Sequence, residues 1–385
     1  MPYWRLSSFY FFYFAALGAL IPYWGLYLKS LGFTHLEIGE MFAILGGTKI
    51  IAPYVWGWLA DRGAPRIGIV RSGSFAALLA FTGVYLVSGY WWMAVVIALF
   101  SFFWNAALPQ FEAATLSHLG DEHHRYSKIR LWGSIGFIVT AFSLGPLMQR
   151  YGSGILVHAL TALFAGIWLA SLFVPESVVG TRRQRPLRIS TILKQPAVIA
   201  LLMISFLMQA GHAPYYAFFS IYLQTYGYSK STIGMLWALG VVAEILVFLY
   251  MHRALPRFGA RHLIIASLLL TIIRWVLTAL FVESLVVIAL AQTLHAASFG
   301  IFHAASIHLI HRFFSGRAQG RGQALYSGIS FGAGGALGSV ASGYAWTLYN
   351  GSVVYIFSAI VTAIALIIAC AGLREPGSGL LEKTP

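Results

Sequence analysis

The 385-residue sequence is strongly apolar and weakly charged: hydrophobic residues make up 59% of it, charged residues 9%, and the mean hydropathy is +0.77. About a quarter of the residues of a soluble domain are charged, so this composition excludes a soluble globular protein and predicts an all-α membrane protein. The net charge of +14 does not indicate nucleic-acid binding, because no basic soluble domain or nucleic-acid motif is present. The single Cys370 excludes an intramolecular disulfide and a cysteine metal cluster.

Long uncharged runs predict twelve transmembrane helices. A helix crosses the hydrocarbon core of a bilayer in about 20 apolar residues, and turn sequences such as Ser88-Gly89-Tyr90 divide the longest runs into two spans. The predicted spans are residues 6–29, 36–60, 67–88, 91–117, 128–149, 154–174, 196–224, 230–252, 261–281, 284–311, 319–347 and 352–373.

The positions of Lys and Arg predict the orientation of these spans. With successive connections on alternate sides, 20 of the 25 basic residues fall on one side, and only Lys29, Arg150 and Lys230 fall on the other. The positive-inside rule then places both termini in the cytoplasm of a multi-pass protein in a bacterial inner membrane. The basic connection 175–195 is predicted to be a cytoplasmic linker between two six-helix halves, residues 1–174 and 196–385.

The connection after the second span carries the sequence GWLADRGAPR, residues 57–66. It resembles the signature loop of the major facilitator superfamily, whose members are transporters with two six-helix halves. The resemblance implies that Asp61, with Arg62 and Arg66, latches one conformation through a helix terminus or an Arg of a neighbouring helix. A solvated basic turn is the alternative interpretation.

An acid and a base flank the loop between the fourth and fifth spans. Glu112 lies in an apolar run and Arg130 heads the next run, and ionisable residues in membrane helices usually mark function. The spacing of Asn105, Pro109, Glu112 and Arg130 resembles lactose permease, which implies that Glu112 and Arg130 pair at a substrate site. The alternative is a salt bridge at the cytoplasmic end.

Other polar residues inside spans are predicted to line a cavity. Lys49 has about a dozen residues on either side of it, so its ammonium group reaches the bilayer surface only with difficulty. Gln209, His212 and Tyr216 share one face of a helix. For His212, a role in packing is the alternative.

The eighth, ninth and tenth spans carry Glu244, Arg274 and His295. We expect Glu244 and Arg274 to pair, because an unpaired charge at this depth would be very costly. The run from Gln292 to Ser298 resembles lactose permease, which has Lys and a proton-carrying Glu at these two positions. The sequence keeps His295 but lacks both charges.

Together with these residues, the resemblance to the major facilitator superfamily implies a proton-coupled symporter that works by alternating access. The C-terminal half resembles most the phenylpropionate permease branch of the superfamily. Inside the spans, Lys49, Arg130 and Arg274 outnumber Glu112 and Glu244 by one, and this excess positive charge suits a monocarboxylate substrate. Four aromatic residues suit an aromatic ring beside the carboxylate: Trp24, Tyr27, Tyr215 and Tyr216. Glu244 is the predicted proton carrier and Glu112 the second candidate, because a motion that separates Glu244 from Arg274 would change its proton affinity.

A proton-coupled sugar or nucleoside symporter that uses Glu112 and Arg130 is the alternative function. An enzyme is not indicated, because the sequence shows no nucleophile–base constellation and no phosphate-binding loop. His303, His308 and His311 have no nearby carboxylate or Cys, so we expect no metal and no cofactor. The predicted partners are a small-molecule substrate, protons and the lipid bilayer, and the protein is expected to be a monomer.

Overall fold

The computed structural model describes residues 2–87, 89–120, 122, 125–176 and 189–374, and none of these residues lies in a strand. The predicted linker 175–195 lies mostly outside the described residues. The first group of helices comprises α1 (Tyr3–Ser30), α2 (His35–Asp61), α3 (Arg66–Thr82), α4 (Tyr90–Leu119), α5 (Tyr126–Tyr151) and α6 (Ile155–Leu172). The second comprises α7 (Ser190–Leu193), α8 (Pro196–Thr225), α9 (Lys230–Phe258), α10 (Ala260–Leu280), α11 (Leu285–Thr293), α12 (Phe302–Phe313), α13 (Gln319–Ser327), α14 (Gly335–Leu348) and α15 (Gly351–Gly372).

Eleven helices among the described residues are long and apolar enough to cross a membrane. The remaining predicted span, 319–347, is also helical, as α13, a π-helical segment and α14. This stretch is rich in glycine and begins with the polar sequence QGRGQ, which lowers its hydropathy. The all-α membrane fold is therefore confirmed, while the count of twelve spans stays a prediction.

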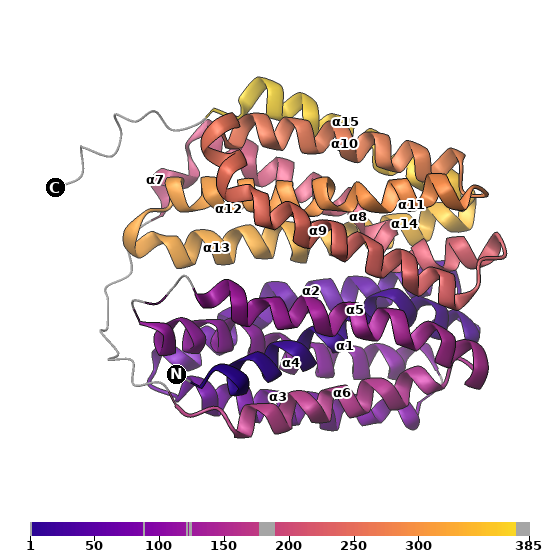
Figure 1. Ribbon diagram of the computed structural model, residues 1–385, viewed down its shortest axis with the longest axis horizontal. Helices are drawn as coiled ribbons and strands as arrows, with labels where there is room; N and C mark the ends of the chain where they lie inside the picture. Colours follow the sequence, from indigo (N-terminus) through magenta and orange to yellow (C-terminus); the bar gives the residue numbers. More distant parts are fainter. Residues whose placement is uncertain (1, 88, 121, 123–124, 177–188, 375–385) are drawn as a thin grey trace.

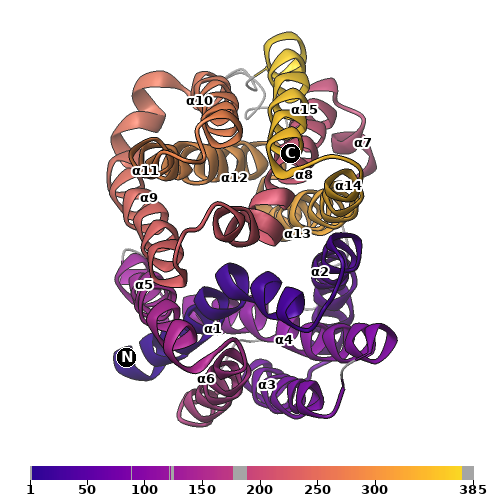
Figure 2. The same cartoon turned by 90° about the vertical axis from the view of Figure 1, so that its right-hand side faces the viewer.

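The helices form two groups, one containing α1–α6 and the other α8–α15 (Figures 1 and 2). The start of α1, the end of α6, the short helix α7 and the end of α15 lie at the same end of the molecule, on the left in Figure 1. We call this end the linker end, and we call the end that carries residues 31–34 and 226–229 the far end.

Equivalent arginines close one helix terminus in each group. Arg71, near the start of α3, donates hydrogen bonds of 2.9–3.3 Å to the last carbonyl groups of α6 and the residues after it. Arg261, at the start of α10, donates one of 2.9 Å to the carbonyl of Cys370 near the end of α15. Such carbonyls have no partner within their own helix. The matching positions support an internal repeat of six helices.

The two groups pack closely against each other at the far end. A Cβ atom added to Gly39 of α2 would collide with the carbonyl oxygen of Ser339 in α14, and one added to Gly234 of α9 would collide with that of Ala141 in α5. The Lys230 ammonium donates a hydrogen bond of 3.1 Å to the serine of the α5–α6 turn. Only glycine allows backbones to come this close, so these positions help to seal the far end.

Two π-helical segments interrupt the helices of the second group. One, Ala296–Ile301, joins α11 to α12, and the other, Gly328–Gly334, joins α13 to α14. A π turn holds more residues than an α turn and often occurs at functional sites. Both segments lie near the middle of the molecule, where polar side chains gather.

Candidate functional site

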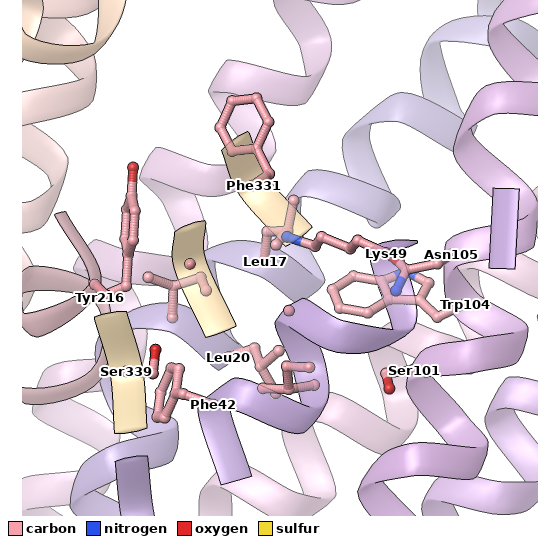
Figure 3. Close-up of a pocket in the computed structure, with 15 residues that line it drawn as sticks. Leu17, Leu20, Phe42, Lys49, Ser101, Trp104, Asn105, Tyr216, Phe331 and Ser339 are labelled. Carbon is pink, nitrogen blue, oxygen red and sulfur yellow. The ribbon is translucent and has the colours of Figure 1, made fainter. Parts of the chain in front are cut away.

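A cavity of about 80 Å³ lies between the two groups of helices (Figure 3). Residues of α1, α2, α4, α8, the second π-helical segment and α14 line it: Leu17, Leu20, Ile21, Phe42, Leu45, Gly46, Lys49, Ser101, Trp104, Asn105, Ala213, Tyr216, Phe331, Gly335 and Ser339. Both halves therefore contribute to one central site, which is where transporters built from repeats bind their substrates.

Lys49 brings a positive charge to this cavity. Its side chain extends from α2 past Trp104 and Asn105 into the space between the groups (Figure 3). The side-chain amide of the neighbouring Asn105 donates a hydrogen bond of 3.0 Å to the Thr48 hydroxyl. In the described part of the chain the ion pairs are Arg125–Glu122 and His295–Glu244, so Lys49 has no acidic partner there. An ammonium group in this position can attract an anion.

Aromatic side chains form the walls around Lys49. Trp104 comes from α4, Tyr216 from α8 and Phe331 from the second π-helical segment. Figure 3 places Tyr216 across the cavity from Lys49, with Phe331 to one side of the gap between them. Aromatic faces and edges can bury a ring of the substrate, so the cavity combines one charge with a mainly apolar surround.

A second polar cluster is buried beside the cavity, between α9, α10 and the first π-helical segment. The Arg274 guanidinium of α10 donates hydrogen bonds to Ser298 Oγ at 2.8 Å and to His295 Nδ1 at 3.2 Å. Nε2 of His295 lies 3.5 Å from Glu244 Oε2 of α9. An imidazole that accepts at Nδ1 and faces a carboxylate with Nε2 is a neutral ring protonated at Nε2. The cluster is thus an acid and a base joined by a neutral histidine.

This arrangement differs from the predicted direct pair of Glu244 and Arg274. His295 directly precedes the π-helical segment and Ser298 lies within it, and both side chains take the hydrogen-bonding positions beside the guanidinium group of α10. Arg274 is fully buried, and its guanidinium carbon also lies 4.2 and 4.5 Å from the ring centres of Tyr215 and Trp275. His295 therefore lies between Glu244 and Arg274, which were predicted from the sequence to pair directly.

Glu112 and Arg130 lie close to the linker end of the first group, but they do not pair directly in the described part of the chain. Oε1 of Glu112 accepts a hydrogen bond of 3.2 Å from the Tyr126 hydroxyl. The Arg130 guanidinium stacks on Phe14, 3.7 Å from the ring centre. Neither residue lines the central cavity. Their predicted pairing at a substrate site requires a conformational rearrangement, or a substrate large enough to reach them from the cavity.

Three residues predicted to bind substrate are packed away from the cavity. Trp24 is fully buried and lies against Phe81 of α3, and Tyr27 packs beside Trp24. Both lie beyond Leu20 along α1, toward the sealed far end. Nδ1 of His212 is 2.8 Å from the Met208 carbonyl, and its ring packs on Trp275. Of the predicted lining face of α8, Tyr216 lines this cavity, and Gln209 and His212 do not.

Comparison with known proteins identifies the family to which this chain belongs. The family model described as MFS_1 like family matches residues 3–357, which is most of the chain. The chain belongs to the MFS_1 like family. It is an MFS transporter, and not an enzyme, because its relatives and fold neighbours are transporters.

Individual relatives of this MFS transporter are named for different substrates. It is 29% identical over 374 residues to a probable 3-phenylpropionic acid transporter of Escherichia coli (strain K12), covering 93% of this chain and 94% of the relative. It is 24% identical over 365 residues to the maltose permease of Geobacillus stearothermophilus, covering 94% and 92%. Among solved structures, the nucleoside transporter NupG superposes with a TM-score of 0.82 at 19% identity over 98% of this chain and 100% of the other. The last likeness shows the fold alone.

The signature loop of this MFS transporter lies at the linker end. Asp61 is the last residue of α2 and is exposed. The Arg62 guanidinium lies 3.8 Å from the ring centre of Trp58, and Arg66 donates a hydrogen bond of 3.0 Å to the Gln110 side chain of α4. Arg66 thus already links two helices, while the latch role of Asp61 stays a prediction.

The sequence alone did not single out Trp104 or Phe331 as cavity residues of the MFS transporter. Trp104 directly precedes Asn105 in an apolar run, and aromatic residues are common in such runs. Phe331 faces the cavity from within a π-helical segment, and α-helical periodicity does not predict the direction of its side chain. The glycines around it, Gly328, Gly332 and Gly334, are the one local signal for unusual backbone geometry.

Proposed function

We propose that this MFS transporter carries a small aromatic monocarboxylate, similar to phenylpropionate, together with protons by alternating access. The observation that supports the substrate class is the ammonium group of Lys49, which enters a cavity between the two halves and has no acidic partner in the described part of the chain. A carboxylate can supply the missing negative charge through a charge-assisted hydrogen bond.

The rest of the cavity suits the apolar part of such a molecule. Trp104, Tyr216 and Phe331 surround the space beside Lys49 with aromatic surface. A phenyl ring buried between them would gain apolar burial and edge-to-face contacts. The relative of Escherichia coli that is named a probable 3-phenylpropionic acid transporter is consistent with this class of substrate.

Coupling to protons is proposed for the cluster of Glu244, His295 and Arg274. The carboxyl side chain of Glu244 is 17% exposed and His295 lies between it and the buried guanidinium group. A movement of α9 relative to α10 would separate the carboxyl group of Glu244 from His295 and Arg274. Protonation of Glu244 would then depend on conformation, which is the requirement for coupled transport. Glu112 remains the second candidate.

We also propose that the linker end faces the cytoplasm of a bacterial inner membrane and that the protein acts as a monomer. The charge distribution of the sequence supports this orientation. The sealed far end would then face outward, and the structure would represent a state closed to the outside.

Transport of a nucleoside or a sugar is the second candidate. The likeness to a maltose permease favours a sugar, and Glu112 and Arg130 offer hydrogen-bonding groups for hydroxyls near the linker end. A sugar or nucleoside would offer Lys49 no negative charge, whereas a carboxylate substrate would.

Thermal unfolding of the purified transporter with candidate ligands distinguishes the two proposals. A ligand that binds only the folded state stabilises it by about 2.7 kcal/mol at a concentration of 100 Kd. We expect 3-phenylpropionate to raise the unfolding temperature, and its amide, uridine and maltose to have much smaller effects at equal concentration. Stabilisation by uridine or maltose, without any by the acid, would reverse the assignment. Uptake into proteoliposomes with an imposed pH gradient then tests proton coupling.

A further inference from the structure

His303, near the start of α12, lies on the same helix face as His295. Phe299 lies midway between them in the sequence, and spacings of four residues bring all three side chains to one face. Their rings are stacked in turn. The ring centres of His295 and Phe299 are 5.6 Å apart, those of Phe299 and His303 are 5.5 Å apart, and the ring planes are within 11° and 6° of parallel. The stack holds the two histidines in a fixed relation.

The side chain of Glu244 reaches this helix between the two histidines. A Cβ atom added to Gly300, the residue after Phe299, would lie 3.4 Å from Cγ of Glu244. Oε2 of Glu244 is 3.5 Å from Nε2 of His295, and the charge of Glu244 also acts on His303. Glu244 therefore has a histidine on each side of it along the helix, and only His295 belongs to the cluster with Arg274.

His303 lies between this carboxyl group and the linker end. The chain runs from α11, on the far-end side, to α12 and α13 on the linker-end side (Figure 1). His295 is buried, whereas His303 is partly exposed. Nδ1 of His303 is 3.4 Å from the hydroxyl oxygen of Tyr326 in α13, which is a long hydrogen bond. The imidazole thus connects the neighbourhood of Glu244 to an element of the linker end.

The groups around His303 carry charges of opposite sign. Glu244 acts on it from α9 and Arg130 from α5, and Tyr326 is the titratable group within hydrogen-bonding distance on α13. A carboxylate attracts an imidazolium ion, and a guanidinium group repels it. An imidazole between such charges can take up a proton and release it again, because neither charge alone decides its state.

We propose that His303 relays the proton between Glu244 and the linker end, an inference that rests on the proton coupling proposed for Glu244. Protonated Glu244 gives its proton to Nε2 of the neutral ring, whose Nδ1–H donates to the Tyr326 oxygen. The carboxyl O–H bond breaks and an N–H bond forms, which leaves a carboxylate and an imidazolium ion. The imidazolium ion then releases its Nδ1 proton to water on the linker-end side and becomes neutral. Tyr326 is a positioning residue, because it determines which nitrogen is free to accept.

Infrared spectroscopy after a rapid pH jump tests the relay on the purified full-length protein. The band of the protonated Glu244 carboxyl group is identified by its loss in Glu244→Gln. General acid–base groups accelerate proton transfer by about 10²–10⁴-fold. We therefore expect two variants to keep the band but slow its change at least about ten-fold: His303→Gln, which can still bond to Tyr326, and His303→Phe, which keeps the ring stack. His262→Gln is the matched control, because it removes an exposed histidine from the same half, and its rate should equal that of the wild type.

Added imidazole separates a relay from a packing role. It should restore the fast change to His303→Ala and leave the rate of the wild type unaltered, and failure to restore it would assign His303 to packing. Equal rates in the wild type and in His303→Gln or His303→Phe would overturn the relay and leave coupling at Glu244 intact. A wild type in which no Glu244 band changes with pH would overturn the coupling role of this acid, and the relay with it. Either of the Gln and Phe variants decides the question if the other does not fold.

Discussion

Replacing Lys49 with Gln tests the substrate class, because it removes the charge from the cavity and keeps a polar side chain of similar length. A charge-assisted hydrogen bond to the substrate carboxylate contributes about 1.5–3 kcal/mol. Since about 1.4 kcal/mol corresponds to a factor of ten, Lys49→Gln should weaken binding of 3-phenylpropionate roughly 10- to 150-fold. Its amide, which carries no charge, should lose less than about three-fold.

Calorimetric titration of the purified protein with the acid and the amide measures both effects in one series. Lys194→Gln is a suitable control, because this exposed lysine just before α8 carries the same charge outside the cavity. The unfolding temperature of each variant shows whether the change acts through the fold. Equal weakening of acid and amide would assign Lys49 to structure, and unchanged affinity for both would remove it from the site.

Four further substitutions test the mechanism, the latch, the seal and the orientation. Glu244→Gln should abolish pH-driven accumulation of substrate in proteoliposomes but preserve exchange at equilibrium; accumulation in the variant would exclude this acid as the proton carrier. Asp61→Asn should slow turnover and change ligand affinity only by the shift in conformational population, measured by uptake and binding, and normal uptake would remove Asp61 from the mechanism. Gly234→Val should force α9 away from α5, so cross-linking across the far end should fall, and unchanged cross-linking would contradict the observed packing. Ser190→Cys should resist an impermeant thiol reagent outside intact cells, and rapid labelling would reverse the orientation.

The helix boundaries were largely predictable, because charged and turn residues mark where a chain leaves the bilayer. The span predicted at 196–224 is observed as Pro196–Thr225, and that predicted at 352–373 as Gly351–Gly372. Within the span predicted at 319–347, Gly338 packs closely on α8, since a Cβ atom on it would lie 2.5 Å from the carbonyl oxygen of Ala210. Composition and turn signals are strong in a membrane protein.

The directions of the side chains were harder to predict. One face of a membrane helix meets lipid and another meets protein, and both are apolar, so hydrophobic periodicity gives little information about which residue faces the centre. Lys49 was predictable because a charge cannot face hydrocarbon, whereas Trp24 is stable in either environment and is found in the core. The role of His295 between Glu244 and Arg274 depends on a π-helical segment, which has no clear signal in the sequence.

The π-helical segment Gly328–Gly334 holds one extra residue within a helix that is otherwise α-helical. Removing one residue there, for instance Ala333, would restore α-helical geometry and leave the residues of α14 facing as before. Removing one residue within α14, for instance Val340, would instead rotate all following residues by about 100°, so Gly343 would turn away from α2 and a larger side chain would meet the opposing backbone. Single-residue deletions should therefore be tolerated in the loops and in this segment, but not between Gly338 and Gly343.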